Sequence, residues 1–284
     1  YTLTVTGTGN FTGTATKDWT IARKDISNAV ITLGEKLTYN GQEQTQTVTS
    51  VTVDGLSVTY DVTGNTGTDA GDYTLTITGT GNFTSAATKG WTIAPKEISN
   101  AVITLGEALT YNGQEQTQTI DSVTVDDLTV TYDVTGNKGT DAGDYTLTIT
   151  GTGNFTSAAT AKFTIAKREV TITNAAVDTS KVYDGTTAAR IAYAGIIKNM
   201  VPNDDVKIVQ GTAAYGDKNV GTAKTVTFTG FTLDGSAAAN YILTGQPADT
   251  LADITAREIT VTVAVKEKTF DGTTDAELAS AALD

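Results

Sequence analysis

The amino-acid sequence predicts an all-β chain made of tandem repeats, and three observations support this prediction. Apolar residues alternate with threonine in short runs such as YTLTIT at residues 73–78, which is the period of a strand with one buried face. Runs of this kind recur every 72 residues. Within the 72-residue repeats, no stretch of ten or more residues shows the period of 3.6 that an amphipathic helix requires.

The repeats divide the chain into five parts. Residues 23–94 and 95–166 are identical at 61 of 72 positions, and an aromatic residue followed by Asn-Gly or Asp-Gly recurs at positions 39, 111, 183 and 270. We therefore expect a window on a longer array. Its expected parts are the C-terminal part of a repeat (1–22), two complete repeats (23–94 and 95–166), a longer repeat (167–255) and the N-terminal part of a further repeat (256–284).

Turn signals divide each repeat into an expected number of about seven short strands. They are Asn40-Gly41, Asp54-Gly55, Gly64-Asn65 and the GTGN run at 79–82. Threonine makes up 60 of 284 residues, and its β-branched side chain suits the solvent face of a strand. In the longer repeat, the alanine-rich residues 186–200 suggest a helical turn.

A core is expected from the apolar positions of these strands. The spacing of DAGDYTL at residues 69–75 matches the tyrosine corner of immunoglobulin-like sandwiches, and a tyrosine that is simply part of the core fits equally well. The longer repeat has Ala223 in place of this tyrosine, which puts a corner there in doubt. We expect these residues, with their partners 72 positions on, to be buried: Tyr73, Leu75, Ile77, Phe83, Trp91 and Ile93.

Composition excludes several classes of function. The chain has no His and no Cys, which excludes Ser-His and Cys-His nucleophiles, histidine bases and Cys/His zinc sites. A net charge of −13 argues against binding to nucleic acid and to anionic lipid. No apolar run approaches the length of a membrane span, and no signal peptide is evident, since the chain opens within a strand-like pattern.

Three kinds of site have simpler interpretations that the sequence favours. Calcium is a minority alternative to solvated turn carboxylates, because no twelve-residue calcium loop is present. An isopeptide crosslink at the joint position occupied by Lys24, Lys96 and Arg168 is disfavoured, because arginine cannot form one. A surface charge beside Asp25, Glu97 or Glu169 is expected there instead. The candidate calcium carboxylates are Asp61, Asp69 and Asp72, then Asp121, Asp126 and Asp127, then Asn203, Asp204 and Asp205.

Sequons for N-glycosylation begin at Asn10, Asn82 and Asn154. A turn followed by a core phenylalanine is the favoured interpretation of each. No catalytic, cofactor-binding or metal-binding residues are assigned. An enzyme is not expected, since near-duplicated domains add length whereas a catalytic site is needed once.

The repeats resemble two known families. The 72-residue units are similar to the MBG-type repeats of large bacterial surface proteins, through YNG, AGDYTLTITGTGNFT and a closing WTIA. The longer unit resembles the YDG repeat, through KVYDGTT at 181–187, NYIL at 240–243 and ADI at 252–254. This resemblance implies an extracellular, multi-repeat adhesin that is secreted or held at the bacterial cell surface. The families have no catalytic residues that could be assigned to positions of this chain.

The leading functional hypothesis is therefore a stalk or fibre. In it, immunoglobulin-like β-sandwich repeats follow one another end to end as an extended rod that projects a binding region away from the cell. The expected partners are neighbouring repeats of the same chain. Two alternatives remain open: the repeats themselves bind a host protein, a glycan or a surface, or copies of the chain assemble into an extracellular filament.

Overall fold

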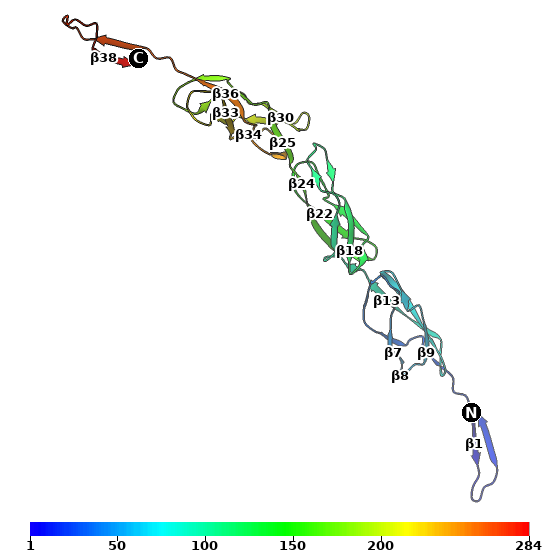
Figure 1. The fold of residues 1–284 in the computed structure, drawn as a ribbon. Coiled ribbons are helices and arrows are strands. Elements are labelled where there is room, and N and C mark those ends of the chain that lie inside the picture. Colours follow the sequence, from blue (N-terminus) through cyan, green and yellow to red (C-terminus); the bar gives the residue numbers. More distant parts are fainter. Residues whose placement is uncertain (284) are drawn as a thin grey trace. The chain divides into compact units, whose positions relative to one another are not determined.

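The computed structural model describes residues 1–283 and is all-β, which confirms this part of the predicted fold class (Figure 1). The described residues form no α-helix, and their one helical element is the 3-10 turn η1 (Ala238–Asn240). No helix among them has the length and apolar character to cross a bilayer. The helical turn expected within residues 186–200 is wrong, because this segment forms three short strands that each pair with another strand of the longer repeat.

The chain forms two compact units. The first comprises Tyr1–Glu107, Thr117–Lys138 and Tyr145–Phe163, and the second comprises Ala108–Gln116, Gly139–Asp144 and the chain from Thr164 onward. The division therefore runs through the repeat at residues 95–166. Each unit contains the contacts that join one repeat to the next.

In the first unit, residues 23–94 build two main sheets around one core. The longer strands β11 and β13 pair from Gly71 opposite Ile93 to Thr78 opposite Ala86. The four-stranded sheet has the order β5 (Leu37–Thr38), β13 (Ala86–Ala94), β11 (Gly71–Gly79), β9 (Tyr60–Thr63). The three-stranded sheet has the order β4 (Val30–Leu33), β7 (Val48–Val53), β8 (Leu56–Ser57).

Short ladders complete this repeat. Two pairs of two-residue strands are formed by β6 (Gln44–Thr45) with β10 (Thr66–Gly67), and by β3 (Lys24–Asp25) with β12 (Phe83–Thr84). Residues 23–94 therefore contain eleven strand segments, β3 to β13, rather than the seven expected. The excess arises because two-residue bridges have no side-chain period by which the sequence could reveal them.

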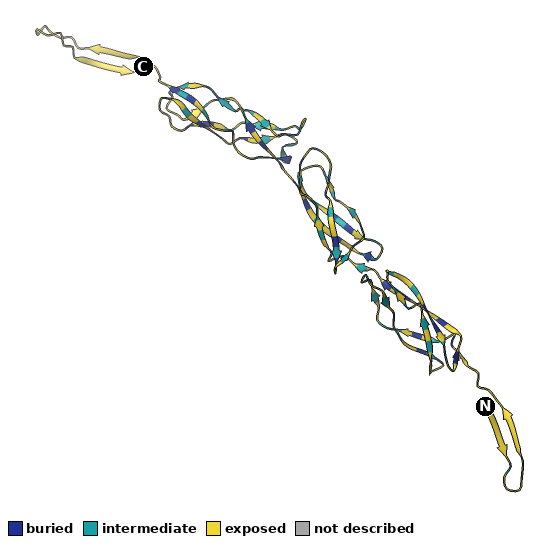
Figure 2. Cartoon of the chain, turned by 45° about the vertical axis from the view of Figure 1, so that its right-hand side comes forward, coloured by how far each residue is buried: buried dark blue, intermediate teal, exposed yellow. Residues whose placement is uncertain are grey.

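The core of this repeat is made by the predicted alternating positions. Leu75, Ile77 and Ile93 are fully buried, and Trp91 and Phe83 are buried with them. Figure 2 shows this alternation of buried and exposed residues along the strands. The equivalent residues 72 positions on are also buried, namely Leu147, Ile149, Phe155, Phe163 and Ile165.

Tyr73 differs from the prediction, since it is only half-buried, and Tyr145 is likewise. The Tyr73 ring stacks on Trp91 with centroids 4.6 Å apart, while its hydroxyl donates a hydrogen bond to the backbone oxygen of Asp69 at 2.8 Å. A bond from a strand-opening tyrosine to the backbone four residues upstream is the contact of a tyrosine corner. The hydroxyl stays at the sheet edge to make it, which keeps the side chain from full burial.

The repeat at 95–166 has the same elements. Within the first unit, β15, β18 and β19 form a three-stranded sheet, β20 pairs with β22, and β14 pairs with β23. Within the second unit, β16 pairs with the end of β24. The bounds are β14 (Lys96–Glu97), β15 (Val102–Leu105), β16 (Leu109–Thr110), β17 (Gln116–Thr117), β18 (Ile120–Val125), β19 (Leu128–Thr129), β20 (Tyr132–Thr135), β21 (Lys138–Gly139), β22 (Gly143–Gly151), β23 (Phe155–Thr156) and β24 (Ala158–Ala166).

The longer repeat lies in the second unit and has a larger sheet in the order β27-β36-β33-β32-β28. A three-stranded sheet, β30-β25-β35, and the pairs β26-β29 and β31-β34 complete it. The bounds are β25 (Arg168–Thr173), β26 (Ala176–Val177), β27 (Ser180–Val182), β28 (Ala188–Ala189), β29 (Ile191–Tyr193), β30 (Ile196–Lys198), β31 (Lys207–Val209), β32 (Thr212–Tyr215), β33 (Gly221–Thr229), β34 (Thr232–Asp234), β35 (Tyr241–Leu243) and β36 (Thr250–Thr255).

Each end of the chain is an isolated hairpin. The N-terminal hairpin pairs β1 (Thr2–Thr6) with β2 (Thr14–Asp18), and the C-terminal hairpin pairs β37 (Val261–Val265) with β38 (Leu278–Leu283). The residues of all four strands are exposed (Figure 2). Tyr1 stacks on Trp19 at 5.0 Å, as Tyr73 does on Trp91.

Candidate functional site: the repeat junctions

The strongest candidate site is the junction between consecutive repeats, because short parallel ladders bring groups from two repeats to each joint. The first junction described is the joint between residues 23–94 and residues 95–166. There β14 pairs with β23 so that Lys96 lies opposite Phe155, and the Lys96 nitrogen donates to the Asn154 backbone oxygen. From the preceding repeat, the Tyr39 nitrogen donates to the Ala94 oxygen at 2.9 Å. Tyr39 and the Asn154-Phe155 segment therefore both lie beside residues 94–97.

The Asn154 side chain links the two repeats of the first unit. Its Oδ1 accepts a hydrogen bond from the backbone nitrogen of Ala70 at 2.7 Å, and its Nδ2 donates to Asp69 Oδ1 at 2.9 Å. We call this pair of bonds the asparagine clasp. The Tyr39 and Phe155 rings meet edge to face beside it, with centroids 5.4 Å apart. The junction thus combines a two-point polar contact with an aromatic one.

The same clasp recurs in the second unit, where the following repeat is of the longer type. Asn240 Oδ1 accepts from the Ala142 nitrogen at 2.7 Å, and Asn240 Nδ2 donates to Asp141 Oδ1 at 2.9 Å. The rings of Tyr111 and Tyr241 replace the earlier pair, again edge to face at 5.4 Å. Two repeats of different length and sequence therefore accept the preceding repeat by the same contacts.

The longer repeat adds a carboxylate to its junction. Asp204 Oδ2 accepts hydrogen bonds from the hydroxyls of Tyr111, at 2.8 Å, and Tyr241, at 2.5 Å. Burial and the hydrogen bond to Asp204 raise the pKa of Tyr241 to about 12, and the same two causes raise the pKa of Tyr111. Both tyrosines stay protonated as donors to this carboxylate far into the alkaline range.

An apolar contact at the Asn-Gly turn closes each junction. A Cβ added at Gly41 would lie 2.7 Å from Leu128 Cδ2, and one added at Gly113 would lie 2.7 Å from Val201 Cγ1. Both glycines have positive φ, of +77° and +81°, which any L side chain adopts with strain. Glycine is therefore required here both by the turn and by the side chain of the next repeat that packs over it.

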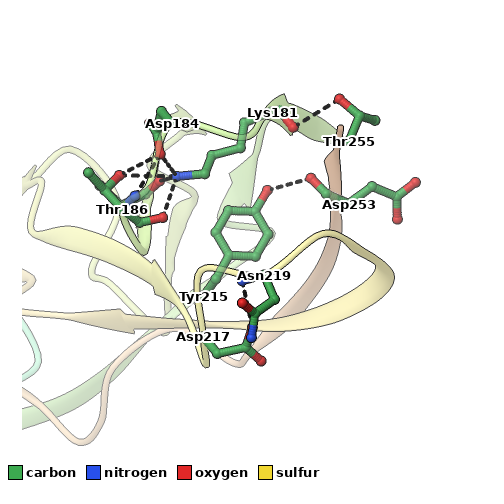
Figure 3. A network of polar contacts seen from close by, with 9 residues as sticks. Lys181, Asp184, Thr186, Tyr215, Asp217, Asn219, Asp253 and Thr255 are labelled. Carbon is green, nitrogen blue, oxygen red and sulfur yellow. Dashed lines mark hydrogen bonds and ion pairs between the residues drawn. The ribbon is translucent and has the colours of Figure 1, made fainter. Parts of the chain in front are cut away.

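A second polar cluster lies within the longer repeat (Figure 3). Lys181 Nζ donates to Asp184 Oδ1 at 2.9 Å and to the backbone oxygens of Thr186 and Ala188, and it lies 5.6 Å from the Tyr215 ring centroid. The hydrogen bond from Lys181 lowers the pKa of Asp184 to about 2, helped by the Thr186 nitrogen. A similar pair, Lys268 Nζ with Asp271 Oδ1 at 2.9 Å, recurs in the last segment. The lysine organises the Tyr-Asp-Gly turn and has its donors satisfied.

The longer repeat also shows what replaces the corner tyrosine at Ala223. Ala223 has a φ of +49°, and its nitrogen donates to Asp253 Oδ1 at 2.8 Å. The buried Tyr215 instead donates to the Asp253 backbone oxygen, at 3.1 Å. A tyrosine from a neighbouring strand therefore makes the edge contact, and no corner of the Tyr73 kind forms at Ala223.

Several of the carboxylates considered for calcium are engaged in protein contacts. Asp69 and Asp204 belong to the junctions, Asp72 accepts from Thr92 Oγ1 at 2.8 Å, and Asp205 accepts from the nitrogen of Ser236 at 3.1 Å. Asp127 occupies a turn at a φ of +64°. Within residues 1–283, no three carboxylates gather as a metal site would require.

The joint lysines have partners other than those expected. Lys24 pairs with Asp54, and Lys96 pairs with Asp126 at 2.5 Å, so the expected pairing with the adjacent Asp25 and Glu97 is wrong. At the same position, Arg168 donates to the Asn199 backbone oxygen at 2.6 Å instead of pairing with Glu169. The reason is strand alternation: adjacent side chains on a strand point to opposite faces, whereas the turn after β7 or β18 lies within reach.

The sequon asparagines share a turn but differ in surroundings. Asn154 is half-buried in the clasp, whereas Asn10 and Asn82 are exposed. The interpretation as a turn before a core phenylalanine holds for Phe83 and Phe155, but Phe11 is 76% exposed. Sequence reasoning missed the linking role of this asparagine. Asn stands before an aromatic residue at positions 154 and 240, but the same pair at positions 10 and 82 makes no such link, so the pattern alone does not reveal it.

Comparison with known proteins identifies one part of the chain. No curated protein matches it. Residues 166–250 match the family model of the YDG domain, which agrees with the resemblance noted for the longer repeat. The repeat that follows the second junction is therefore a YDG domain.

Proposed function

We propose that this chain is a structural stalk or fibre module of a large bacterial adhesin, whose immunoglobulin-like β-sandwich repeats hold a binding region away from the cell surface. The observation that carries the proposal is the recurrence of the asparagine clasp. Asn154 and Asn240 hold the preceding repeat through the same two bonds, at the same distances. A joint that repeats its contacts repeats its rotation, and this is how solenoid-like arrays become regular.

The joints favour stiffness in this proposal. Only residues 95–97 separate the closing strand of one repeat from Ile98, which is fully buried in the next. The segment contains no glycine or serine, the residues that make a linker flexible, and Pro95 fixes its own φ. The clasp and the ring pair join the two repeats by non-covalent contacts in addition to this covalent link. We therefore propose an extended, stiff arrangement of the repeats.

The proposal is one of structure rather than catalysis. Two carboxylates of the junctions accept hydrogen bonds from neutral side chains: Asp204 from two tyrosines and Asp69 from Asn154. Binding by the repeats themselves would need an exposed feature that recurs every 72 residues. The aromatic residues Tyr60 and Tyr132, which recur at this interval, are only partly exposed. The contacts between repeats therefore support the stalk better than a recurrent ligand site.

Small-angle scattering of the chain tests the proposal. Three repeats in line, with strands that rise about 3.3 Å per residue, should give a longest dimension on the order of 100 Å or more. Variants Asn154→Ala and Asn240→Ala should broaden the distribution of distances, because each loses the clasp at one joint. Asn10→Ala is the matched control, since Asn10 is exposed and should leave the curve unchanged. A compact particle in the parent chain would overturn the stalk proposal.

A further inference from the structure

We propose that the surface formed by the exposed residues Asn82 and Leu56, beside the buried Phe83, is a docking surface for one further repeat end. The occupant that fits this surface is a second copy of the repeat end that Tyr39–Gly41 and Asp69–Ala70 form in residues 23–94. This inference deepens the proposed stalk and rests on it. It assigns a binding role to residues that make no such contact in this chain.

The three equivalent asparagines differ in whether a repeat end lies against them. Asn82 is exposed, Asn154 is half-buried in its clasp, and Asn240 is buried, at 6% exposure. The backbone around Asn82 is already set for docking: its oxygen accepts from the Lys24 nitrogen at 2.9 Å, as the Asn154 oxygen does from Lys96. The backbone of Asn82 therefore has the same pairing as the backbone of Asn154, whose side chain binds Ala70 and Asp69.

The apolar part of the surface follows the same pattern. Leu56 is 54% exposed, whereas its equivalent Leu128 is partly buried and packs over the Gly41 turn. Phe83 holds the position of Phe155, whose ring meets Tyr39. Where equivalent positions of two repeats carry an apolar side chain that is exposed in one and covered in the other, the exposed copy lacks a contact that the covered copy makes.

A hollow is present at this surface. It has a volume of about 450 Å³ and is lined by residues that include Ile21, Arg23, Leu56, Asn82 and Phe83. The Tyr-Asn-Gly turn fits such a hollow, because at the first junction the bare Cα of Gly41 lets Leu128 approach closely. The surface thus offers one amide with a donor and an acceptor, one exposed leucine and a phenylalanine that lines the hollow, which match the groups of the Tyr39–Gly41 and Asp69–Ala70 end.

The hairpin before this surface indicates which repeat supplies that end. Residues 1–22 differ from residues 73–94 at only four positions, namely 5, 13, 14 and 18. In residues 23–94, strands of this sequence carry the Tyr39 and Asp69–Ala70 end at their side, since β5 pairs with β13 and the Tyr73 hydroxyl binds the Asp69 oxygen. A repeat completed around β1 and β2 would therefore present the same end to Asn82.

The experiment joins a second copy of residues 23–72 in front of Tyr1 of the full chain, which completes this repeat. The added segment alone is labelled with ¹⁵N by ligation, so that its amides are distinguished from their identical copies. The measurement is hydrogen exchange of the added copy of the Ala70 amide, which the clasp should protect. One hydrogen bond is worth about 1 kcal/mol net, so Asn82→Ala should speed this exchange about fivefold to tenfold.

Two variants of the same extended protein serve as controls. Asn10→Ala alters the equivalent asparagine of the added repeat, which faces no further repeat end, and should leave the exchange rate unchanged. Asn154→Ala should speed exchange of the original Ala70 amide and leave the added copy protected. A separate sample labelled in the original chain reports that amide and the Ala142 amide.

The outcomes separate the two proposals. Protection of the added Ala70 amide that is lost in Asn82→Ala supports the docking surface. If the added amide exchanges at the same rate with either residue at position 82, while the original Ala70 and Ala142 amides stay protected, the docking surface is wrong and the stalk stands. If the original amides are also unprotected, the junctions do not hold in solution and the stalk proposal fails with it.

Discussion

Asn154 Oδ1 lies 2.7 Å from the backbone nitrogen of Ala70, although the two residues are 84 positions apart and belong to different repeats. Asn240 makes the same contact with Ala142 across 98 positions. In both cases the side-chain amide satisfies a backbone donor at a loop, which a hydrophobic side chain at that position would leave without a protein partner.

Truncation of the core should destabilise residues 23–94 strongly. Leu75 is fully buried between the sheets, and Leu75→Ala should cost about 2–5 kcal/mol through lost burial and a residual cavity. Denaturant unfolding followed by the fluorescence of Trp91 measures this change. The matched control is Leu3→Ala in the terminal hairpin, where the leucine is 57% exposed. An unchanged midpoint for Leu75→Ala would contradict the strand register described here.

The turn after β18 is predicted to improve when glycine replaces its second aspartate. Asp126 and Asp127 have φ values of +47° and +64°, while the equivalent turn after β7 has Asp54 and Gly55. Asp127→Gly should therefore stabilise its repeat by about 0.5–1 kcal/mol, since an L side chain is strained in the left-handed region. Gly55→Asp should destabilise residues 23–94 by a similar amount, as measured by hydrogen exchange of strand amides. Shifts of the same sign in both variants would refute this explanation.

Stability should fall with alkaline pH because of Tyr241. Its pKa is raised to about 12 in the folded chain from an ordinary value of 10, so the folded state keeps a proton that the unfolded state releases. The stabilisation is complete below pH 10 and is lost as the pH rises towards 12. In Tyr241→Phe this part of the pH dependence should disappear. The measurement is the free energy of unfolding at several pH values between 9 and 12, and equal slopes in parent and variant would count against the raised pKa.

Removal of divalent metal should leave the melting temperature unchanged. The aspartates near the turns are bound to protein groups, as Asp69 is to Asn154 and Asp126 to Lys96, and these contacts compete with coordination of a cation. Calorimetry with and without EDTA, at constant ionic strength, makes the comparison. A fall of the melting temperature in EDTA that added calcium reverses would show that these carboxylates hold a metal.

The sequence was sufficient for the fold class and most of the core. Alternation of period two places Leu75 and Ile77 on one face, and burial of both follows from that period alone. The alanine-rich segment at 186–200 was misjudged because its strands have only two or three residues, too few to display a period. Their conformation is set by partners far along the chain, as Ala188 is by Ala214.

The junctions could not be predicted in the same way. Asn154 follows Gly153 in a turn, and its local sequence is the same as that of Asn82, which makes no clasp. What distinguishes the two is the presence of another repeat end, and no local pattern encodes that. Asp204 likewise joins Tyr111 from 93 positions away. Contacts of this kind depend on how short parallel ladders such as β14 with β23 orient the chain at the joint.

The clasp also bears on how arrays of this kind can change over time. The preceding repeat contributes to the clasp only a backbone nitrogen and a single carboxylate. The following repeat contributes one asparagine, which both a 72-residue repeat and a YDG domain possess. A gene could therefore lose, gain or exchange whole units by recombination without redesigning the surfaces between them. The order of unit types would then be a matter of genetic history, while the joint stays the same.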